Sequence, residues 1–159
     1  MIVRPRLDAD AEALVAILAR THALDGYPVR ESRVTWDWLV DEILHAWTAA
    51  QDDRPIGHVG IAEPVDGSLL PTGSLEVTRL FVDPDVRGAG AAGRLLDVVE
   101  GHAVQLDRPL GLEVVAGSEA AIRFYLRRGW TEIGQRAATW STADGARPTL
   151  IGFVAPPAG

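Results

Sequence analysis

Residues 75–96 read LEVTRLFVDPDVRGAGAAGRLL, and this stretch decides the fold. Its first part alternates in the manner of a strand, with Leu75, Val77, Arg79 and Phe81 on one face. An Asp-Pro turn and a glycine-rich loop follow, and a helix with paired leucines begins after the loop. A strand that leads through such a loop into a helix gathers backbone N–H groups at the helix N-terminus, where phosphate binds. The segment predicts a strand, a phosphate-binding loop and a helix.

The rest of the chain predicts a mixed α/β (α+β) domain around one sheet. The expected elements are a strand at Ile2–Arg6, a helix capped by Asp8 or Asp10 with the apolar stripe Ala11, Leu14, Leu18 and Thr21, a helical stretch after Thr35, a hairpin of Ala46–Ala50 and Ile56–Ala62, a helix that ends near Leu106, a strand at Leu110–Val115, a helix from the cap Ser118 to Arg128, and closing strands at Trp130–Trp140 and Thr149–Val154. The length suits a single domain over residues 1–159, with a frayed tail at 155–159.

Composition excludes several classes of site and partner. The chain has no cysteine, and all 15 of its basic residues are arginine, so disulfides, thiol nucleophiles and Schiff-base lysines are excluded. The histidines are scattered, so no metal site is expected. A net charge of −7 disfavours nucleic acid and suits cationic ligands, although it also serves solubility. Neither a signal peptide nor a membrane-spanning segment is visible, so we expect a cytoplasmic protein.

The glycine-rich loop also matches the dinucleotide fingerprint, as Gly88, Gly90 and Gly93. That fingerprint belongs to the first strand–helix–strand unit and needs an acidic residue at the end of the second strand. Here the loop lies past the middle of the chain, and Leu110–Val115 does not end in an acid. A dinucleotide-dependent oxidoreductase is therefore disfavoured, while a tight turn without a ligand stays an alternative.

Two motifs in order resemble the GNAT superfamily of acyl-CoA-dependent N-acyltransferases. The family pattern R/Q-x-x-G-x-G/A is matched by Arg87, Gly90 and Ala92. The second family pattern is N-x-x-A-x-x-x-Y-x-x-x-G-F, and its positions are filled by Ser118, Ala121, Tyr125, Gly129 and Trp130. Serine replaces asparagine and tryptophan replaces phenylalanine, which leaves a ligand role of Ser118 open. The resemblance implies one GNAT-like domain with a central, mostly antiparallel mixed sheet and about four flanking helices.

The resemblance also implies acetyl-CoA as cosubstrate and assigns residues to it. The cofactor-binding residues would be Leu80, Phe81, Val82, Arg87, Gly88, Ala89, Gly90, Ala91, Ala92, Gly93 and Ser118. Main-chain groups of the strand would hold the pantetheine arm, and a nearby N–H would polarise the thioester. Tyr125 would protonate the departing thiolate, because a phenol is a neutral donor at pH 7. Glu76 would take the amine's proton, directly or through water.

Each catalytic assignment has a structural alternative. Tyr125 shares a helix stripe with Ala121, Ile122 and Leu126 and could be plain core. Glu76 could be a strand-edge acid that pairs with an arginine such as Arg79. Glu113 is a weaker candidate for the base and is expected to pair with an arginine. A non-catalytic acyl-CoA-binding sensor module is the alternative for the whole chain.

The acceptor would be a small-molecule or peptide amine, and its identity lies outside the motifs. The family builds its acceptor site partly from the region of Trp36 and Trp38. The segment Asp25–Glu42 joins acidic residues to these tryptophans and Tyr27, which favours a cationic amine by Coulomb attraction and cation–π contact. A solvated helix face balanced by arginines is the alternative. Family members are often dimers, so a homodimer stays open, as does a longer acyl donor.

Overall fold

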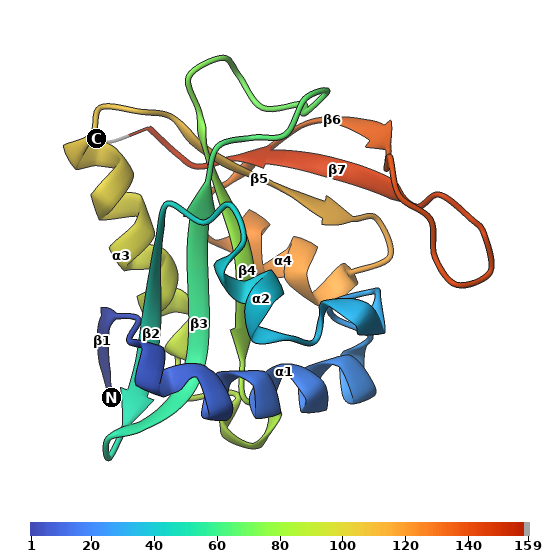
Figure 1. Ribbon diagram of the computed structural model, residues 1–159. Coiled ribbons are helices and arrows are strands. Elements are labelled where there is room, and N and C mark those ends of the chain that lie inside the picture. Colours follow the sequence, from blue (N-terminus) through green and yellow to red (C-terminus); the bar gives the residue numbers. More distant parts are fainter. Residues whose placement is uncertain (158–159) are drawn as a thin grey trace. The chain divides into compact units, whose positions relative to one another are not determined.

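The computed structural model describes residues 1–157 and contains a mixed sheet with helices, the fold class that the sequence predicts (Figure 1). Its strands are β1 Ile2–Pro5, β2 His45–Gln51, β3 Arg54–Ala62, β4 Leu75–Val82, β5 Leu110–Val115, β6 Thr131–Ala137 and β7 Thr149–Val154. Its helices are α1 Ala11–Asp25, α2 Trp36–Val40, α3 Ala91–Gln105 and α4 Glu119–Arg127, with single turns of 3₁₀-helix at Asp8–Asp10, Glu31–Arg33 and Pro84–Val86. The seven strands follow the order β1-β2-β3-β4-β5-β7-β6.

The chain forms two compact units. The first unit contains Met1–Ala62 and Val77–Gly101, and the second contains Glu63–Glu76 and the chain from His102 onward. β4 begins in the second unit and continues in the first.

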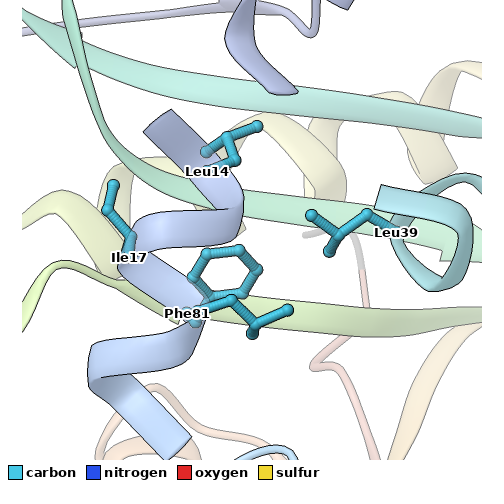
Figure 2. Packing of buried hydrophobic residues seen from close by; sticks show 5 residues of the cluster. Leu14, Ile17, Leu39 and Phe81 are labelled. Carbon is cyan, nitrogen blue, oxygen red and sulfur yellow. The ribbon is translucent and has the colours of Figure 1, made fainter. Parts of the chain in front are cut away.

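The core of the first unit forms on the apolar face of α1. Leu14, Ile17 and Leu18 are buried there, together with Leu39 of α2 and Phe81 of β4 (Figure 2). The predicted apolar stripe is confirmed at Leu14, Leu18 and Thr21, which are all buried. Ala11 is only partly buried, and Ile17 belongs to the buried face instead. The helix ends at Gly26, which adopts a left-handed conformation with φ of 72°.

The hairpin of the first unit is the one that the sequence predicts. β2 and β3 pair antiparallel, and the turn residues Asp52 and Asp53 have φ of 51° and 63°. Two successive left-handed residues are typical of the tight turns that join twisted strands. The helical stretch after Thr35 is shorter than its apolar spacing suggested. Thr35 accepts a hydrogen bond from the Trp38 backbone N–H, and α2 ends at Val40.

Asp10 precedes α1 but does not cap it with its side chain. Its carboxylate accepts two hydrogen bonds from Arg4, both of 2.8 Å, and one each from the Leu7 N–H and the Thr48 hydroxyl, both of 2.9 Å. The predicted cap is therefore wrong in detail, because an arginine on β1 outcompetes the helix's own N–H groups. These hydrogen bonds, led by those of Arg4, lower the pKa of Asp10 to about 2.

Asp10→Asn should destabilise the protein at neutral pH and remove part of its sensitivity to acid. The native pKa lies below the ordinary 3.8, so the ionised carboxylate stabilises the fold above about pH 4, and this is lost as the pH falls towards about 2. The effect should be about 2–3 kcal/mol, measured by chemical unfolding. The exposed neighbour Asp8 offers the control, since Asp8→Asn removes the same charge from the same segment. Equal stability of the two variants at pH 7 would contradict the assignment.

In the second unit, β5 pairs antiparallel with β7, and β7 pairs antiparallel with β6. The first residues of β4 pair parallel with β5, at Leu75 with Leu110 and Glu76 with Gly111. Gly111 must be a glycine, because a Cβ atom there would lie 2.8 Å from the Phe153 carbonyl oxygen.

Three expectations about element ends need correction. α3 ends at Gln105, one residue before the predicted end, and Leu106, whose spacing predicts a place on the same apolar stripe, is 49% exposed, whereas Leu95, Leu96, Val99 and Ala103 are buried. Trp140 lies beyond the end of β6. The tail is anchored where it begins, because the Ala155 N–H donates to the Leu110 carbonyl over 2.9 Å. Residues 158–159, which were also expected to fray, lie outside the described residues.

Candidate active site

The loop between β4 and α3 has the geometry of an anion site. We call Arg87–Gly93, which includes the first three residues of α3, the phosphate loop. Gly88 and Gly90 adopt left-handed conformations with φ of 90° and 82°, and a Cβ atom at either position would meet nothing within 4 Å. The first hydrogen bond of α3 runs from the Arg94 N–H to the Gly90 carbonyl over 3.1 Å, so the N–H groups that precede it have no partner in the helix. The residues therefore fit a pyrophosphate at the helix N-terminus.

A buried aspartate fixes the entrance to the phosphate loop. Asp83, 8% exposed, accepts hydrogen bonds from the Asp85 N–H over 3.0 Å and from Arg20 of α1 over 2.7 Å. The sequence marked Asp83 only as part of a turn. Its partner on α1 is 63 residues away, a distance at which no local pattern points to the pair.

Arg87 of the phosphate loop forms an ion pair with Asp25, at the last residue of α1. The resemblance assigned Arg87 to the pyrophosphate, and this pair was not expected. A guanidinium bound to a carboxylate must exchange that partner before it can bind a phosphate through the same N–H groups.

Asp25→Asn should therefore tighten CoA binding, since it removes the carboxylate that holds Arg87. An exposed ion pair is worth about 0.2–1 kcal/mol, which corresponds to a decrease in the Kd for CoA of up to about fivefold. Calorimetry measures the change. Glu12→Gln is the matched control, because Glu12 is an exposed acid on the same helix and its loss changes the net charge equally. Unchanged or weaker CoA binding in Asp25→Asn would show that the pair does not compete.

β4 precedes the phosphate loop in the chain and contributes main-chain groups to the candidate site. Leu80 and Val82 are half-buried, whereas Phe81 is 4% exposed and its ring packs with α1 in the core (Figure 2). Only the main chain of Phe81 is thus available to a ligand. The residue before them, Arg79, has φ of 53°, an unusual conformation for a residue with a side chain.

In the second unit, Tyr125 lies at the centre of an aromatic cluster. It is 7% exposed, and its ring centroid lies 5.5 Å from those of Phe124 and Trp130 and 6.1 Å from that of Phe153. The tryptophan that replaces the family's phenylalanine is itself 2% exposed, so it fills the apolar slot that its position predicts. Both the packing role and the chemical role of Tyr125 are compatible with this environment.

Ser118 occupies the position before α4 but makes no side-chain cap hydrogen bond. Its main chain serves instead, with its N–H donating to Val115 over 2.9 Å and its carbonyl accepting from Ile122 over 3.0 Å. The cap expected from its hydroxyl is wrong.

Glu76 and Glu113 lie in one charged cluster with Arg136. Glu113 accepts two hydrogen bonds of 2.7 Å from Arg136, the arginine pairing that was predicted for it. The pKa of Arg136 is raised above its usual value, first by the hydrogen bonds to Glu113 and further by the charge of Glu76. The arginine near Glu76 in this cluster is thus Arg136. Arg79, which the sequence offered only as an alternative partner for Glu76, donates to the Trp38 and Asp41 carbonyls, over 2.9 and 3.3 Å.

The aromatic faces of the segment Asp25–Glu42 carry the chain's own arginines. The guanidinium carbon of Arg6 lies 4.8 Å from the Trp36 ring centroid, and that of Arg79 lies 4.6 Å from the Trp38 centroid. Both tryptophans also pack against the core. These two rings already carry cations of the chain, so among the predicted features only the exposed carboxylates of the segment favour a cationic acceptor.

Among residues 1–157 there is no group of three or more side chains that could hold a metal ion. Over the same residues no helix is both long and apolar enough to cross a membrane.

Comparison with known proteins decides the family. The model of the acetyltransferase (GNAT) family matches residues 11–130 of the chain. The chain belongs to the GNAT family. It is 32% identical to the peptidyl-lysine N-acetyltransferase YjaB of Escherichia coli over 138 residues, 84% of each chain.

Solved structures agree in fold with this GNAT enzyme. The ribosomal-protein-alanine N-acetyltransferase of Brucella melitensis superposes with a TM-score of 0.71 at 19% identity, covering 97% of this chain and 98% of the other. Arabidopsis thaliana NAA60, solved in complex with acetyl-CoA, gives a TM-score of 0.72 at 19% identity and covers 96% of both chains.

The GNAT enzyme transfers an acetyl group from acetyl-CoA to an amine, as the two sequence motifs predicted. An active transferase is thus supported over the acyl-CoA sensor. Sequence reasoning named Asp25 only as an acid of the segment Asp25–Glu42 and missed its pairing with Arg87 and the arginines on the tryptophans. These contacts join residues that are far apart in the sequence.

Proposed function

We propose that the GNAT enzyme acetylates an amine of a peptide or protein, with the lysine side chain as the leading acceptor. One observation carries the proposal: a relative named for peptidyl-lysine acetylation is 32% identical over 84% of the chain. The exposed carboxylates Glu31, Asp37, Asp41 and Glu42 support it, since they attract a cationic peptide. A small-molecule amine is the second candidate. The family match runs through both compact units, which supports a single acetyltransferase domain; a cytoplasmic location and a homodimer stay predictions.

For the cosubstrate, we assign its pyrophosphate to the phosphate loop and its arm to the main chain of Leu80, Phe81 and Val82. Acetyl-CoA supplies a thioester, whose carbonyl oxygen gains negative charge when the amine attacks. The open space beside Gly88 and Gly90 supports the first assignment. In this proposal Ser118 contacts the cosubstrate only through its short hydroxyl side chain, because its main-chain N–H and carbonyl are bound to Val115 and Ile122 and its side chain does not cap α4.

Two side chains of the second unit carry the proton transfers in this proposal. A primary amine with a pKa near about 10 is charged at pH 7, so it must lose a proton before it attacks. Glu76 accepts that proton, directly or through water, as the C–N bond forms. The C–S bond then breaks, and the hydroxyl of Tyr125 gives its proton to the departing thiolate. The observation that supports Glu76 is its place in a charged cluster, where its charge raises the pKa of Arg136.

The acceptor's KM should rise with ionic strength, whereas the KM for acetyl-CoA should change less steeply. Asp37→Asn and Asp41→Asn should each raise the acceptor's KM by up to about fivefold, as an exposed charge pair is worth about 0.2–1 kcal/mol. Initial rates with a lysine peptide give both constants. Asp66→Asn, an exposed loop aspartate of the second unit, is the control. Anionic amines that react better than cationic ones would contradict the charge argument.

The proposed acceptor is tested with matched peptides and acetyl-CoA. One peptide carries a free lysine and a blocked N-terminus, the second a free N-terminus and no lysine, and a diamine represents small molecules. The enzyme contains no lysine, so every acetyl-lysine found by mass spectrometry comes from the acceptor. We expect the lysine peptide to give the highest kcat/KM. A higher value for the diamine would favour the small-molecule alternative.

A further inference from the structure

His58 is a buried titratable residue of the first unit that the proposed chemistry does not use. It lies in the middle of β3 with 0% of its surface exposed, among residues that are almost all apolar or glycine. Its ring stacks on Phe81 of β4, with centroids 5.2 Å apart. A buried imidazole without hydrogen-bond partners would destabilise the fold, so each of its two nitrogens is expected to have a partner.

Both ring nitrogens of His58 have partners, and these partners determine the tautomer. Nδ1 lies 2.8 Å from the carbonyl oxygen of Arg79, and Nε2 lies 3.0 Å from Nη1 of Arg6. A carbonyl only accepts and a guanidinium only donates, so Nδ1 carries the proton and Nε2 is the acceptor. Burial lowers the pKa of His58 to about 4, and the neutral ring prevails at neutral pH. Arg6 is itself held, by a 2.7 Å hydrogen bond to the Leu39 carbonyl.

The carbonyl that His58 holds belongs to the left-handed residue of β4. Arg79 has φ of 53°, and such a conformation persists only where the surroundings enforce it. Its guanidinium donates to the Trp38 carbonyl over 2.9 Å and lies on the Trp38 ring. The side chain is thus fixed by α2, while its carbonyl is fixed by His58.

A held carbonyl also directs the next N–H group. The Arg79 carbonyl and the Leu80 N–H belong to the same peptide group, which is planar and trans. In a trans peptide group the C=O bond of Arg79 and the N–H bond of Leu80 point in opposite directions. Because His58 binds the carbonyl, the Leu80 N–H points away from His58. Leu80 is the first β4 residue that the proposed function assigns to the arm of acetyl-CoA.

We propose that His58 is a positioning residue for acetyl transfer, which aims the Leu80 N–H at the thioester carbonyl oxygen by holding the Arg79 carbonyl. The inference rests on the proposed function, since it needs acetyl-CoA along β4. An N–H fixed in advance stabilises the negative charge that develops on the carbonyl oxygen without reorganising during the reaction. His58 itself touches neither substrate and acts through the main chain.

Two substitutions of similar size separate this role from simple packing. In His58→Asn the side-chain amide nitrogen lies near the position of Nδ1 and can still donate to the Arg79 carbonyl. In His58→Gln the amide lies near the position of Nε2, towards Arg6, and the donor to Arg79 is lost. We expect kcat to fall at least about tenfold in His58→Gln and less than about threefold in His58→Asn, since one lost donor to the developing charge costs up to about 10²–10³. The Kd for CoA should stay within about twofold in both variants.

Each kcat is calculated from the concentration of protein that binds CoA, which calorimetry measures. Unfolded protein therefore does not lower the kcat of a variant. Equal kcat values in the two variants, or a wild-type kcat in His58→Gln, would overturn the inference. Failure of the proposed function is distinguishable, because the wild-type enzyme would then react poorly with the lysine peptide, whereas the two variants can be compared with any amine that the wild type acetylates.

A second measurement uses the wild-type protein and does not depend on whether a variant folds. Acetyl-CoA has the thioester carbonyl and CoA lacks it, so the Leu80 amide signal in ¹H–¹⁵N spectra should move further with acetyl-CoA than with CoA. Equal shifts with the two ligands would overturn the inference.

Discussion

Gly90→Asp should abolish CoA binding, with an increase in Kd of at least about a hundredfold. The φ of 82° at Gly90 and the open space beside it place a new side chain on the ligand side of the phosphate loop. A carboxylate there would lie at the N-terminus of α3, where the helix dipole and the free N–H groups would bind it in place of the pyrophosphate. Calorimetric titration with CoA measures the effect.

Two controls identify the cause of such a loss. Gly90→Asn has almost the same size as aspartate, and both tolerate a left-handed conformation, so the difference between them reports the charge. Gly145→Asp places the same residue on another glycine with φ of 85° and nothing within 4 Å of its Cβ position, in a loop of the second unit. It should bind CoA as the wild type does. A folded Gly90→Asp variant with unchanged CoA affinity would show that the phosphate loop is not the cofactor site.

Tyr125→Phe should lower kcat more than about tenfold and leave CoA affinity and stability nearly unchanged. The substitution keeps the ring among Phe124, Trp130 and Phe153 and removes only the hydroxyl group. A positioned acid typically contributes about 10²–10⁴-fold to a rate, and loss of packing alone would lower stability instead. Rapid-quench measurement of a single turnover separates the chemical step from product release.

Glu76→Gln provides the companion test of the proposed base. Its activity should recover at higher pH, where more of the acceptor amine is uncharged and the need for a base is smaller. Glu113→Gln is informative as a comparison, because Glu113 is held by Arg136 and its loss should lower stability more than rate. If Tyr125→Phe and Glu76→Gln both match the wild type across pH 6–9, other groups carry the protons and both roles should be withdrawn.

Several elements of the fold could be predicted from the sequence, because the residues that specify them are neighbours in the chain. The glycine loop between β4 and α3, the hairpin of β2 and β3 and the pair β6 and β7 each have turn residues next to patterned apolar residues. The same holds for the two family motifs, which lie within single strand–loop or helix segments. Element ends were less certain, and Leu106 shows why. Its spacing fits the buried stripe of α3, but the helix stops one residue earlier.

The parts of the site that could not be predicted depend on partners far apart in the sequence. Arg6 and His58 are 52 residues apart, and Arg87 and Asp25 are 62 apart. No spacing rule connects such residues, because the contact exists only once the strands and helices have packed. The left-handed conformation of Arg79 could not be predicted for a similar reason. Arginine is not a residue typical of turns, and the conformation is enforced by hydrogen bonds to residues far away in the sequence.

The central claim, acetyl transfer from acetyl-CoA to an amine, is tested most directly by following thiol release together with product mass. The enzyme is incubated with acetyl-CoA carrying an isotope-labelled acetyl group, with and without a lysine peptide. We expect thiol release that depends on the peptide, with one labelled acetyl group on the peptide for each thiol formed. Tight binding of acetyl-CoA without amine-dependent thiol release, across peptides and small amines, would contradict the account and indicate an acyl-CoA sensor.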